Sequence, residues 1–381
     1  MRNRLQPVIL IMAIQTAAWA AEVPSREKLW ELKLGEISGE LPGQAAAEIS
    51  VFYMSFSPDG QRIAAVVGRS SAEESVLILD AADPRKNRKI FNINPGMWFA
   101  GQRILWSPSS QHIILGTILA RVSDGTACFF SPYKNPNSTR YFFVGSDQVA
   151  TNSTHSRGLS FYGLECQPTG TWNIDGMLAG YIMDASAERG LVCIRQTVYE
   201  RWSQAERKWK ASSRAQPSVA VVDVNSMGTV LRLPIDSLDP LVQFADSGKV
   251  VCEGRGTKVR CWEVNSGKQL AEIKAGYHST LDFSTAYRAR RFVTSHYGTI
   301  AGFLADLMGT YHEDPNPNRV IWDIGSGKKL VSWRSASQSV LIPGPYDQGP
   351  SKEPCRFAIS PDGEYIVEGG AGILSLYRVR P

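Results

Sequence analysis

The sequence predicts an all-β protein, a seven-bladed β-propeller of four-stranded antiparallel blades. Short β-branched and apolar runs recur along the chain, and turn sequences separate them. Residues 244–273 show the repeat most clearly, because strand-like runs at 249–252 and 259–264 flank a Gly-Arg-Gly turn, and an Asn-Ser-Gly-Lys turn leads into a third run. A four-stranded sheet cannot bury both of its faces alone. Repeated sheets must therefore pack on one another, and radial packing gives a propeller.

The two ends of the chain carry matching turns. A Ser-Pro-Asp-Gly sequence follows a strand at residues 57–60 and again at 360–363. In such a turn Pro restricts φ, Asp bonds the backbone two residues on, and Gly adopts a positive φ. The last repeat stops one strand short at Pro381, while residues 28–34 form a strand that belongs to no other repeat. We therefore expect residues 28–34 to complete the last blade and close the ring.

The remaining strands follow from the same alternation of apolar runs and turns, and seven blades is the preferred count over six or eight. The third repeat is the hardest to divide. In chain order the expected strands are 51–56, 62–67, 76–80 and 89–93; 104–106 and 112–119; 147–151 and 159–164; 179–183, 191–195, 218–223 and 229–233; 281–284, 292–295, 320–324 and 329–333; and 365–368 and 373–379.

The N-terminus has the pattern of a secretory signal peptide. Arg2 and Arg4 precede an apolar run at 8–18 and the tripeptide Ala-Trp-Ala, so residues 1–21 are expected to be removed and 22–381 to form one domain. The apolar run is shorter than the roughly 20 residues that a membrane span needs. We therefore expect an exported protein, periplasmic or secreted, without a membrane span after cleavage.

Charge and cysteine content limit the class of partner further. Removing Arg2 and Arg4 from the 41 basic residues leaves 39 against 36 acidic ones, and no basic run is dense, so no nucleic-acid partner is expected.

The six cysteines permit disulfides in an exported chain, and Cys252 and Cys261 lie on opposite arms of one predicted hairpin. Their sparse spacing favours the alternative, buried free thiols. No CxxC motif occurs, so a zinc or thioredoxin-type site is not expected, and no His-Glu-x-x-His pattern occurs either. Neither a metal nor a cofactor is predicted.

Several strand endings resemble those of a known repeat family. CWEVNSGK at 261–268 and IWDIGSGK at 321–328 resemble the end of a WD repeat, and Gly276-Tyr277-His278 lies near the place where such repeats carry Gly-His. With the Ser-Pro-Asp-Gly turns, nearly the whole mature chain is similar to WD-repeat propellers and to exported bacterial ones, including the periplasmic propeller of the Tol-Pal system. Only Trp322-Asp323 matches the signature dipeptide outright. The resemblance implies the propeller fold and places His278 and Trp322 in a structural hydrogen-bond network inside the blade.

Acidic residues recur at one position of the repeat, just before the turn between the third and fourth strands. This position could form a ring of carboxylates, but capping of each turn by its own carboxylate is the favoured interpretation. We therefore assign Asp323 a structural role. The residues concerned are Asp80, Asp223, Glu263 and Asp323.

Two insertions, at 196–217 and 296–318, interrupt the connections between the second and third strands of their repeats. Both should therefore leave the same face of the ring. Shorter irregular segments near 120–125 and 152–158 are expected on this face as well. The first insertion is cationic and aromatic, which suits an anionic or carbohydrate partner. The alternative interpretation of the first insertion is a solvated hairpin extension of the blade, whose aromatic residues pack on each other. The candidate binding residues are Tyr199, Arg201, Trp202, Arg207, Trp209, Tyr311 and His312.

The chain lacks the usual sequence signatures of catalysis. It contains no GxSxG nucleophile elbow and no Gly-rich phosphate loop of a standard type. We expect a non-catalytic scaffold that binds a partner protein or a glycan through its insertion-bearing face. The alternative is a propeller enzyme of the lactonase or quinoprotein-dehydrogenase type, with its site at the central channel.

Overall fold

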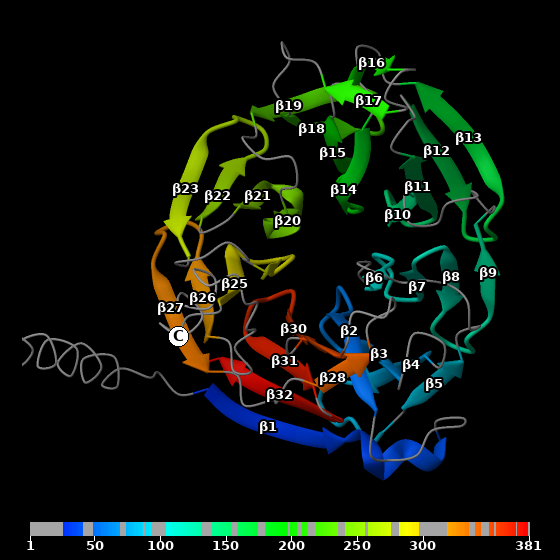
Figure 1. Ribbon diagram of the computed structural model, residues 1–381, viewed down its shortest axis with the longest axis vertical. Coiled ribbons are helices and arrows are strands. Elements are labelled where there is room, and N and C mark those ends of the chain that lie inside the picture. The colour runs from blue at the N-terminus through cyan, green and yellow to red at the C-terminus, as the bar shows by residue number, and fades with distance from the viewer. Residues whose placement is uncertain are drawn as a thin grey trace, which may run out of the picture.

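The protein forms a ring of β-sheets around a central axis (Figure 1). The computed structural model describes residues 26–40, 49–68, 74–86, 88–92, 104–130, 139–153, 158–173, 180–196, 199–203, 208–211, 218–234, 241–255, 258–275, 282–296, 318–334, 340–343, 350–353, 356–370 and 372–379. These residues form seven four-stranded antiparallel sheets, which confirms the predicted seven-bladed propeller. Within these ranges no helix is long and apolar enough to cross a lipid bilayer.

The blades follow one another along the chain, each from its inner to its outer strand. Blades 1 to 3 comprise β2 (Ser50–Phe56), β3 (Arg62–Gly68), β4 (Glu74–Asp80) and β5 (Lys89–Asn92); β6 (Ile104–Trp106), β7 (His112–Leu115), β8 (Ile118–Arg121) and β9 (Ala127–Phe129); and β10 (Thr139–Phe143), β11 (Gln148–Ser153), β12 (Gly158–Gly163) and β13 (Pro168–Asn173). Blades 4 and 5 comprise β14 (Gly180–Ser186), β15 (Leu191–Gln196), β18 (Ser218–Asp223) and β19 (Gly228–Pro234); and β20 (Leu241–Ala245), β21 (Val250–Arg255), β22 (Lys258–Glu263) and β23 (Gln269–Lys274). Blades 6 and 7 comprise β24 (Asp282–Thr285), β25 (Arg291–His296), β26 (Asn318–Asp323) and β27 (Lys329–Arg334); and β30 (Arg356–Ile359), β31 (Tyr365–Gly370), β32 (Ile373–Val379) and β1 (Arg26–Lys33).

In the described part of the chain, four short elements lie outside the blade sheets. They are two two-stranded ribbons, β16 (Tyr199–Ser203) with β17 (Lys208–Ala211) and β28 (Val340–Pro343) with β29 (Pro350–Glu353), and two 3-10 turns, η1 (Leu34–Glu40) and η4 (Asp246–Gly248). The first ribbon falls within the insertion predicted between β15 and β18. The second ribbon precedes blade 7 and was not predicted.

The turn that opens blade 1 shows how local sequence builds the repeat. The Ser57 hydroxyl accepts the backbone N–H of Arg62 at 2.9 Å, and the Asp59 carboxylate accepts the N–H of Gln61 at 3.0 Å. Gly60 has φ of +73°, a conformation that side chains with a Cβ rarely adopt. Because every one of these interactions is local, the turn forms wherever this sequence follows a strand.

Blade 2 differs from the prediction in one respect. The run at 112–119, expected as one strand, is the hairpin of β7 and β8, whose turn contains Gly116 with φ of +60°. The segment at 120–125 therefore covers the end of the third strand and most of its connection to the fourth, and its predicted place between the second and third strands is wrong. The corresponding prediction for blade 3 is correct, because residues 154–157 join β11 to β12.

The N-terminal strand closes the ring. β1 pairs antiparallel with β32, from Arg26 opposite Val379 to Lys33 opposite Ile373. Leu32 is 1% exposed, and the indole N–H of Trp30 donates to the carbonyl of Ala81 in blade 1 at 2.8 Å. The predicted closure is confirmed, and Figure 1 shows β1 along the outer edge of blade 7.

A buried charge cluster joins β1 to blades 6 and 7. The Glu368 side chain is 2% exposed, and its carboxylate lies 2.8 Å from the Arg26 guanidinium and 3.4 Å from that of Arg319. The same carboxylate accepts the indole N–H of Trp333 at 3.0 Å. Arg319 itself is fully buried. Glu368 is therefore the shared partner of three groups, two from blade 6 and one from the N-terminal strand.

The recurring carboxylates cap their own turns. Asp80, Asp223 and Asp323 each accept a backbone N–H from the turn that follows, and Glu263 accepts the hydroxyl of Ser266. These contacts stay within one turn, so they do not make a carboxylate ring. In blade 6 the indole N–H of the neighbouring Trp322 donates to the hydroxyl of Thr294 at 2.9 Å.

Four of the five described cysteines form disulfides. Cys128 in β9 is bonded to Cys166 in the turn after β12, so this bond joins blades 2 and 3. Cys252 and Cys261 lie directly opposite each other on β21 and β22 and are also bonded. Cys193 is buried and free, and Cys355 lies outside the described residues. The favoured expectation of free thiols is therefore wrong for these four residues.

The disulfides predict the number of reactive thiols. Denatured but unreduced protein from an oxidising preparation should be alkylated at no more than two cysteines, Cys193 and Cys355, and at all six after reduction; intact mass measures both. Replacing Cys128 and Cys166 by Ser should lower the free energy of unfolding by about 4 kcal/mol, against about 2.5 kcal/mol for the Cys252 and Cys261 pair, because the first bond closes the longer loop. Alkylation of four or more cysteines before reduction would contradict this pairing.

Candidate functional site

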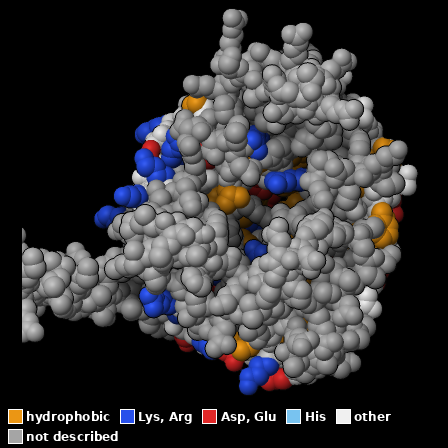
Figure 2. Space-filling view, in the orientation of Figure 1, with side chains coloured by type: hydrophobic (Ala, Val, Ile, Leu, Met, Phe, Trp, Pro, Cys, Tyr) orange, Lys and Arg blue, Asp and Glu red, His pale blue; other side chains and the backbone are white. Residues whose placement is uncertain are grey.

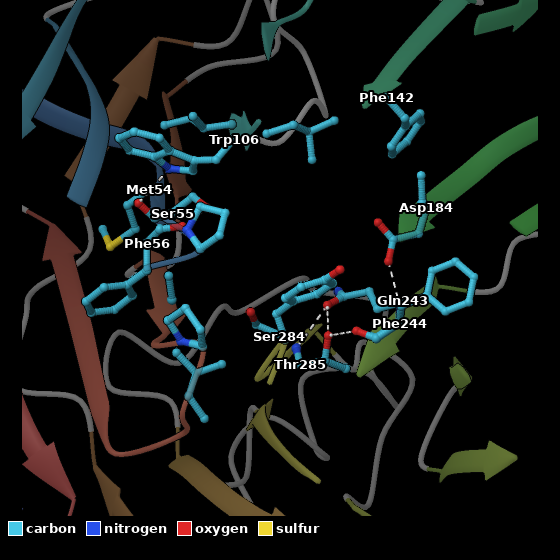
Figure 3. Close-up of a pocket in the computed structure, with 18 of the residues that line it drawn as sticks. Met54, Ser55, Phe56, Trp106, Phe142, Asp184, Gln243, Phe244, Ser284 and Thr285 are labelled. Carbon is cyan, nitrogen blue, oxygen red and sulfur yellow. Dashed lines mark hydrogen bonds between the residues drawn. The ribbon is translucent and has the colours of Figure 1, made fainter. Parts of the chain in front are cut away.

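The inner strands of the blades enclose a cavity on the ring axis (Figure 3). Its volume is about 600 Å³, within the range of roughly 300–1,000 Å³ that is usual for small-molecule sites. Figure 2 shows a hollow at the centre of one face, in which hydrophobic, acidic and basic side chains are visible. This cavity is the candidate functional site.

Aromatic residues recur around the cavity wall. Among the described lining residues, the inner strands of six blades contribute at least one aromatic ring, and that of blade 4 contributes none. The rings are those of Tyr53, Phe56, Trp106, Phe142, Phe143, Phe244, Phe283 and Phe357. Tyr53 and Phe357 are half-buried, and the other rings are largely covered by their neighbours. The wall therefore offers flat apolar surface to a ligand.

Polar side chains of the wall connect neighbouring blades. The side-chain N–H of Gln243 donates to the carbonyl of Phe283 at 2.7 Å, and its oxygen accepts the N–H of Thr285 at 3.0 Å. The Asp184 carboxylate accepts the N–H of Phe244 at 2.7 Å, and Figure 3 shows these groups together. These contacts stabilise the joints between blades 4, 5 and 6 and fix the orientation of the side chains.

Charged residues lie on opposite walls. Asp184 belongs to blade 4, where Glu188 is exposed at the turn and lies 3.5 Å from the Arg288 guanidinium. Arg356 begins the inner strand of blade 7, and its guanidinium carbon lies 5.4 Å from the Tyr53 ring centroid. Blades 4 and 7 face each other across the ring (Figure 1). The cavity is thus negative on one side and positive on the other.

Two further titratable groups lie near the carboxylate wall. Burial raises the pKa of the Tyr287 phenol, whose oxygen lies 3.2 Å from that of Ser186, so the phenol is neutral at pH 7. Burial, and secondly the charge of Asp184, raise the pKa of the Cys193 thiol well above its usual value. Cys193 therefore remains a thiol, which is a poor nucleophile.

The described part of the chain offers no obvious metal site. Within it, no three His, Cys, Asp or Glu side chains are grouped closely enough to hold an ion. The described residues of the cavity wall include neither histidine nor cysteine. The chemistry of these residues is that of aromatic contact, ionic attraction and hydrogen bonding.

None of the residues predicted from the sequence to bind a partner is among the described lining residues of this cavity. Tyr199, Arg201 and Trp202 lie on β16 and Trp209 on β17, in a ribbon inserted between the second and third strands of blade 4. Four other predicted residues lie outside the described ranges; they are Arg207, His278, Tyr311 and His312. Trp322 and Asp323 lie on β26 in blade 6.

Sequence reasoning missed the cavity residues, although one signal points to some of them. Phe56 and Trp106 each directly precede a Ser-Pro turn, and such a residue ends an inner strand at the axis. Asp184 and Arg356 carry no comparable motif. Only the closed ring shows that they face each other.

Fold and cavity together define the protein as a seven-bladed β-propeller with a charged, aromatic axial cavity. No protein-family model matches the sequence, and no curated protein matches it.

Proposed function

We propose that the protein is an exported, non-catalytic, WD-repeat-like propeller of the bacterial type, which binds a partner protein through its insertion-bearing face; a glycan is the alternative occupant. One observation carries this proposal. Both long insertions join the second strand of a blade to the third, β15 to β18 and β25 to β26. Because the blades share one strand order around the ring, these connections leave the same face.

The backbone register of the ribbon in the first insertion separates aromatic from basic positions. Trp202 lies opposite Trp209, and Arg201 lies opposite Lys210, with a bulge after Tyr199. Alternate positions of a strand belong to opposite sides of a sheet, so the aromatic and the basic positions form two separate sets. The first set is Tyr199, Trp202, Trp209 and Ala211, and the second is Arg201, Ser203, Lys208 and Lys210. Tyr, Trp and Arg are the residues most enriched at the energetic centres of protein interfaces.

Two features support the location. The N-terminal pattern is that of a signal peptide, and disulfides persist mainly in oxidising compartments. The WD-type strand endings and the Ser-Pro-Asp-Gly turns support the kinship with exported bacterial propellers.

The alternative function is catalysis at the axial cavity. Asp184 and Gln243 bond the backbone of neighbouring strands, and such contacts suit a rigid binding wall better than proton transfer. We therefore favour binding.

Replacing Trp202 and Trp209 together by Ala tests the proposed function. The partner would be isolated with the wild-type protein from an envelope extract, identified, and titrated against both proteins. We expect its affinity to fall at least about tenfold, since aromatic anchors dominate interface energies, while the melting temperature remains nearly unchanged.

A matched control removes exposed apolar surface elsewhere. Phe129, on the outer strand of blade 2, is 46% exposed, and Met227, in the turn before the outer strand of blade 4, is 48% exposed. Their joint replacement by Ala should leave affinity unchanged. Unaltered partner affinity in the double Trp variant would refute the proposed interface. A large loss of stability would instead place the two Trp residues in the core.

A further inference from the structure

We propose that the axial cavity is a second binding site, which takes a small zwitterion with an aromatic body, of the class of free short peptides. Its ammonium group would lie at Asp184 and its carboxylate at Arg356. The described lining residues of this site all come from outside the ribbon, so the site can be tested separately from the proposed partner interface.

The charges of the cavity match such a ligand in sign and placement. An ammonium ion pairs with a carboxylate, and a carboxylate pairs with a guanidinium, which can bind it through two N–H groups. Asp184 and Arg356 lie on blades that face each other across the axis, so one molecule that extends across the cavity can meet both. A ligand with a single charge would make a charged contact with only one of these two residues.

Both charged groups are held in place before a ligand arrives. The N–H of Phe244 binds the Asp184 carboxylate, which Figure 3 shows beside the open space. The Arg356 guanidinium lies by the Tyr53 ring at cation–π distance. A preorganised site gains affinity because less side-chain freedom is lost on binding.

The space between these groups suits an aromatic body. Tyr53 and Phe357 are half-buried, so part of each ring remains open, and the indole of Trp106 is held by a hydrogen bond to the carbonyl of Ser55 at 3.4 Å. Flat rings stack on such walls. A cavity of about 600 Å³ has room for a molecule of dipeptide size.

Blocked dipeptides test the proposal. The probes are L-phenylalanyl-L-phenylalanine with free ends, its N-acetyl form, its C-terminal amide and the doubly blocked form, each titrated calorimetrically into the full folded protein. We expect the free dipeptide to bind, and each single block to weaken binding about tenfold or more, because each removes one charged contact.

Two substitutions assign each end of the ligand to a residue. In Asp184→Asn, whose amide oxygen can still accept the Phe244 N–H, the free and N-acetyl dipeptides should bind equally. In Arg356→Gln, the free and amidated dipeptides should bind equally. Glu272→Gln, which removes an exposed carboxylate from the outer strand of blade 5, should behave as wild type. Melting curves confirm that each variant is folded.

The proposal is overturned if folded wild-type protein does not bind the free dipeptide at millimolar concentration. It is equally overturned if blocking the ends of the dipeptide leaves its affinity unchanged. A third contradicting result is that each block weakens binding to the two variants as much as it weakens binding to the wild-type protein. Loss of partner binding in the Trp variant would have no bearing on these titrations, so the two proposals fail separately.

Discussion

A chain that begins at residue 34 should lose most or all of its cooperative thermal unfolding transition, compared with one that begins at residue 22. The shorter chain lacks β1, and with it the antiparallel ladder to β32, the buried Leu32 side chain and the Trp30 hydrogen bond to blade 1. Burying one leucine stabilises by roughly 2 kcal/mol, and removing Arg26 also takes away a partner of buried Glu368. The total loss, at least about 5 kcal/mol, is comparable to the stability of a typical domain.

Single substitutions in β1 separate its buried from its exposed face. Leu32→Ala should lower the free energy of unfolding by about 2–5 kcal/mol, since it leaves a cavity in the core. Leu29→Ala on the same strand should change it by less than about 0.5 kcal/mol, because Leu29 is 44% exposed. Calorimetry measures both. If the chain that begins at residue 34 melts like the longer one, the ring does not depend on its N-terminal closure.

Glu368→Gln should destabilise the fold by about 3–5 kcal/mol, measured by denaturant unfolding at pH 7. Glutamine can still accept the Trp333 N–H, so the packing is retained and only the charge is lost. The fully buried Arg319 then keeps its positive charge without the carboxylate that neutralises it. Removing one member of a buried ion pair lowers the free energy of unfolding because the remaining charge is poorly solvated.

Two companion variants distinguish charge from packing. In the double variant Glu368→Gln with Arg319→Met, most of the lost stability should return, because the fully buried guanidinium is removed as well, and Arg26, whose side chain is 18% exposed, is reached by water. Glu272→Gln removes the carboxylate of an exposed pair with Lys258 and should leave the melting temperature essentially unchanged, since water screens such pairs. If Glu368→Gln and Glu272→Gln have equal effects, the buried cluster does not hold blades 6 and 7 together.

The strands and turns of this protein were largely predictable because their determinants are local. The Ser-Pro-Asp-Gly turn at 57–60 contains its positive-φ glycine, and its side chains bond the backbone of the next two residues, Gln61 and Arg62. The missing last strand and the unassigned first one were both visible in the sequence, so the closure of blade 7 could be predicted as well. Blade 2 was misread where Gly116 turns the chain inside an uninterrupted apolar run.

The amino-acid sequence alone determined the repeat, the turns and the pairing of the two chain ends, since these depend on neighbouring residues and on the alternation of apolar positions. The tertiary structure decided which distant residues meet. Only the closed ring brings Asp184 and Arg356 to opposite walls of one cavity, joins Cys128 to Cys166 between blades, and buries Arg319 against Glu368. The physical reason is that each of these contacts depends on how whole blades pack around the axis, and no short stretch of sequence records that arrangement.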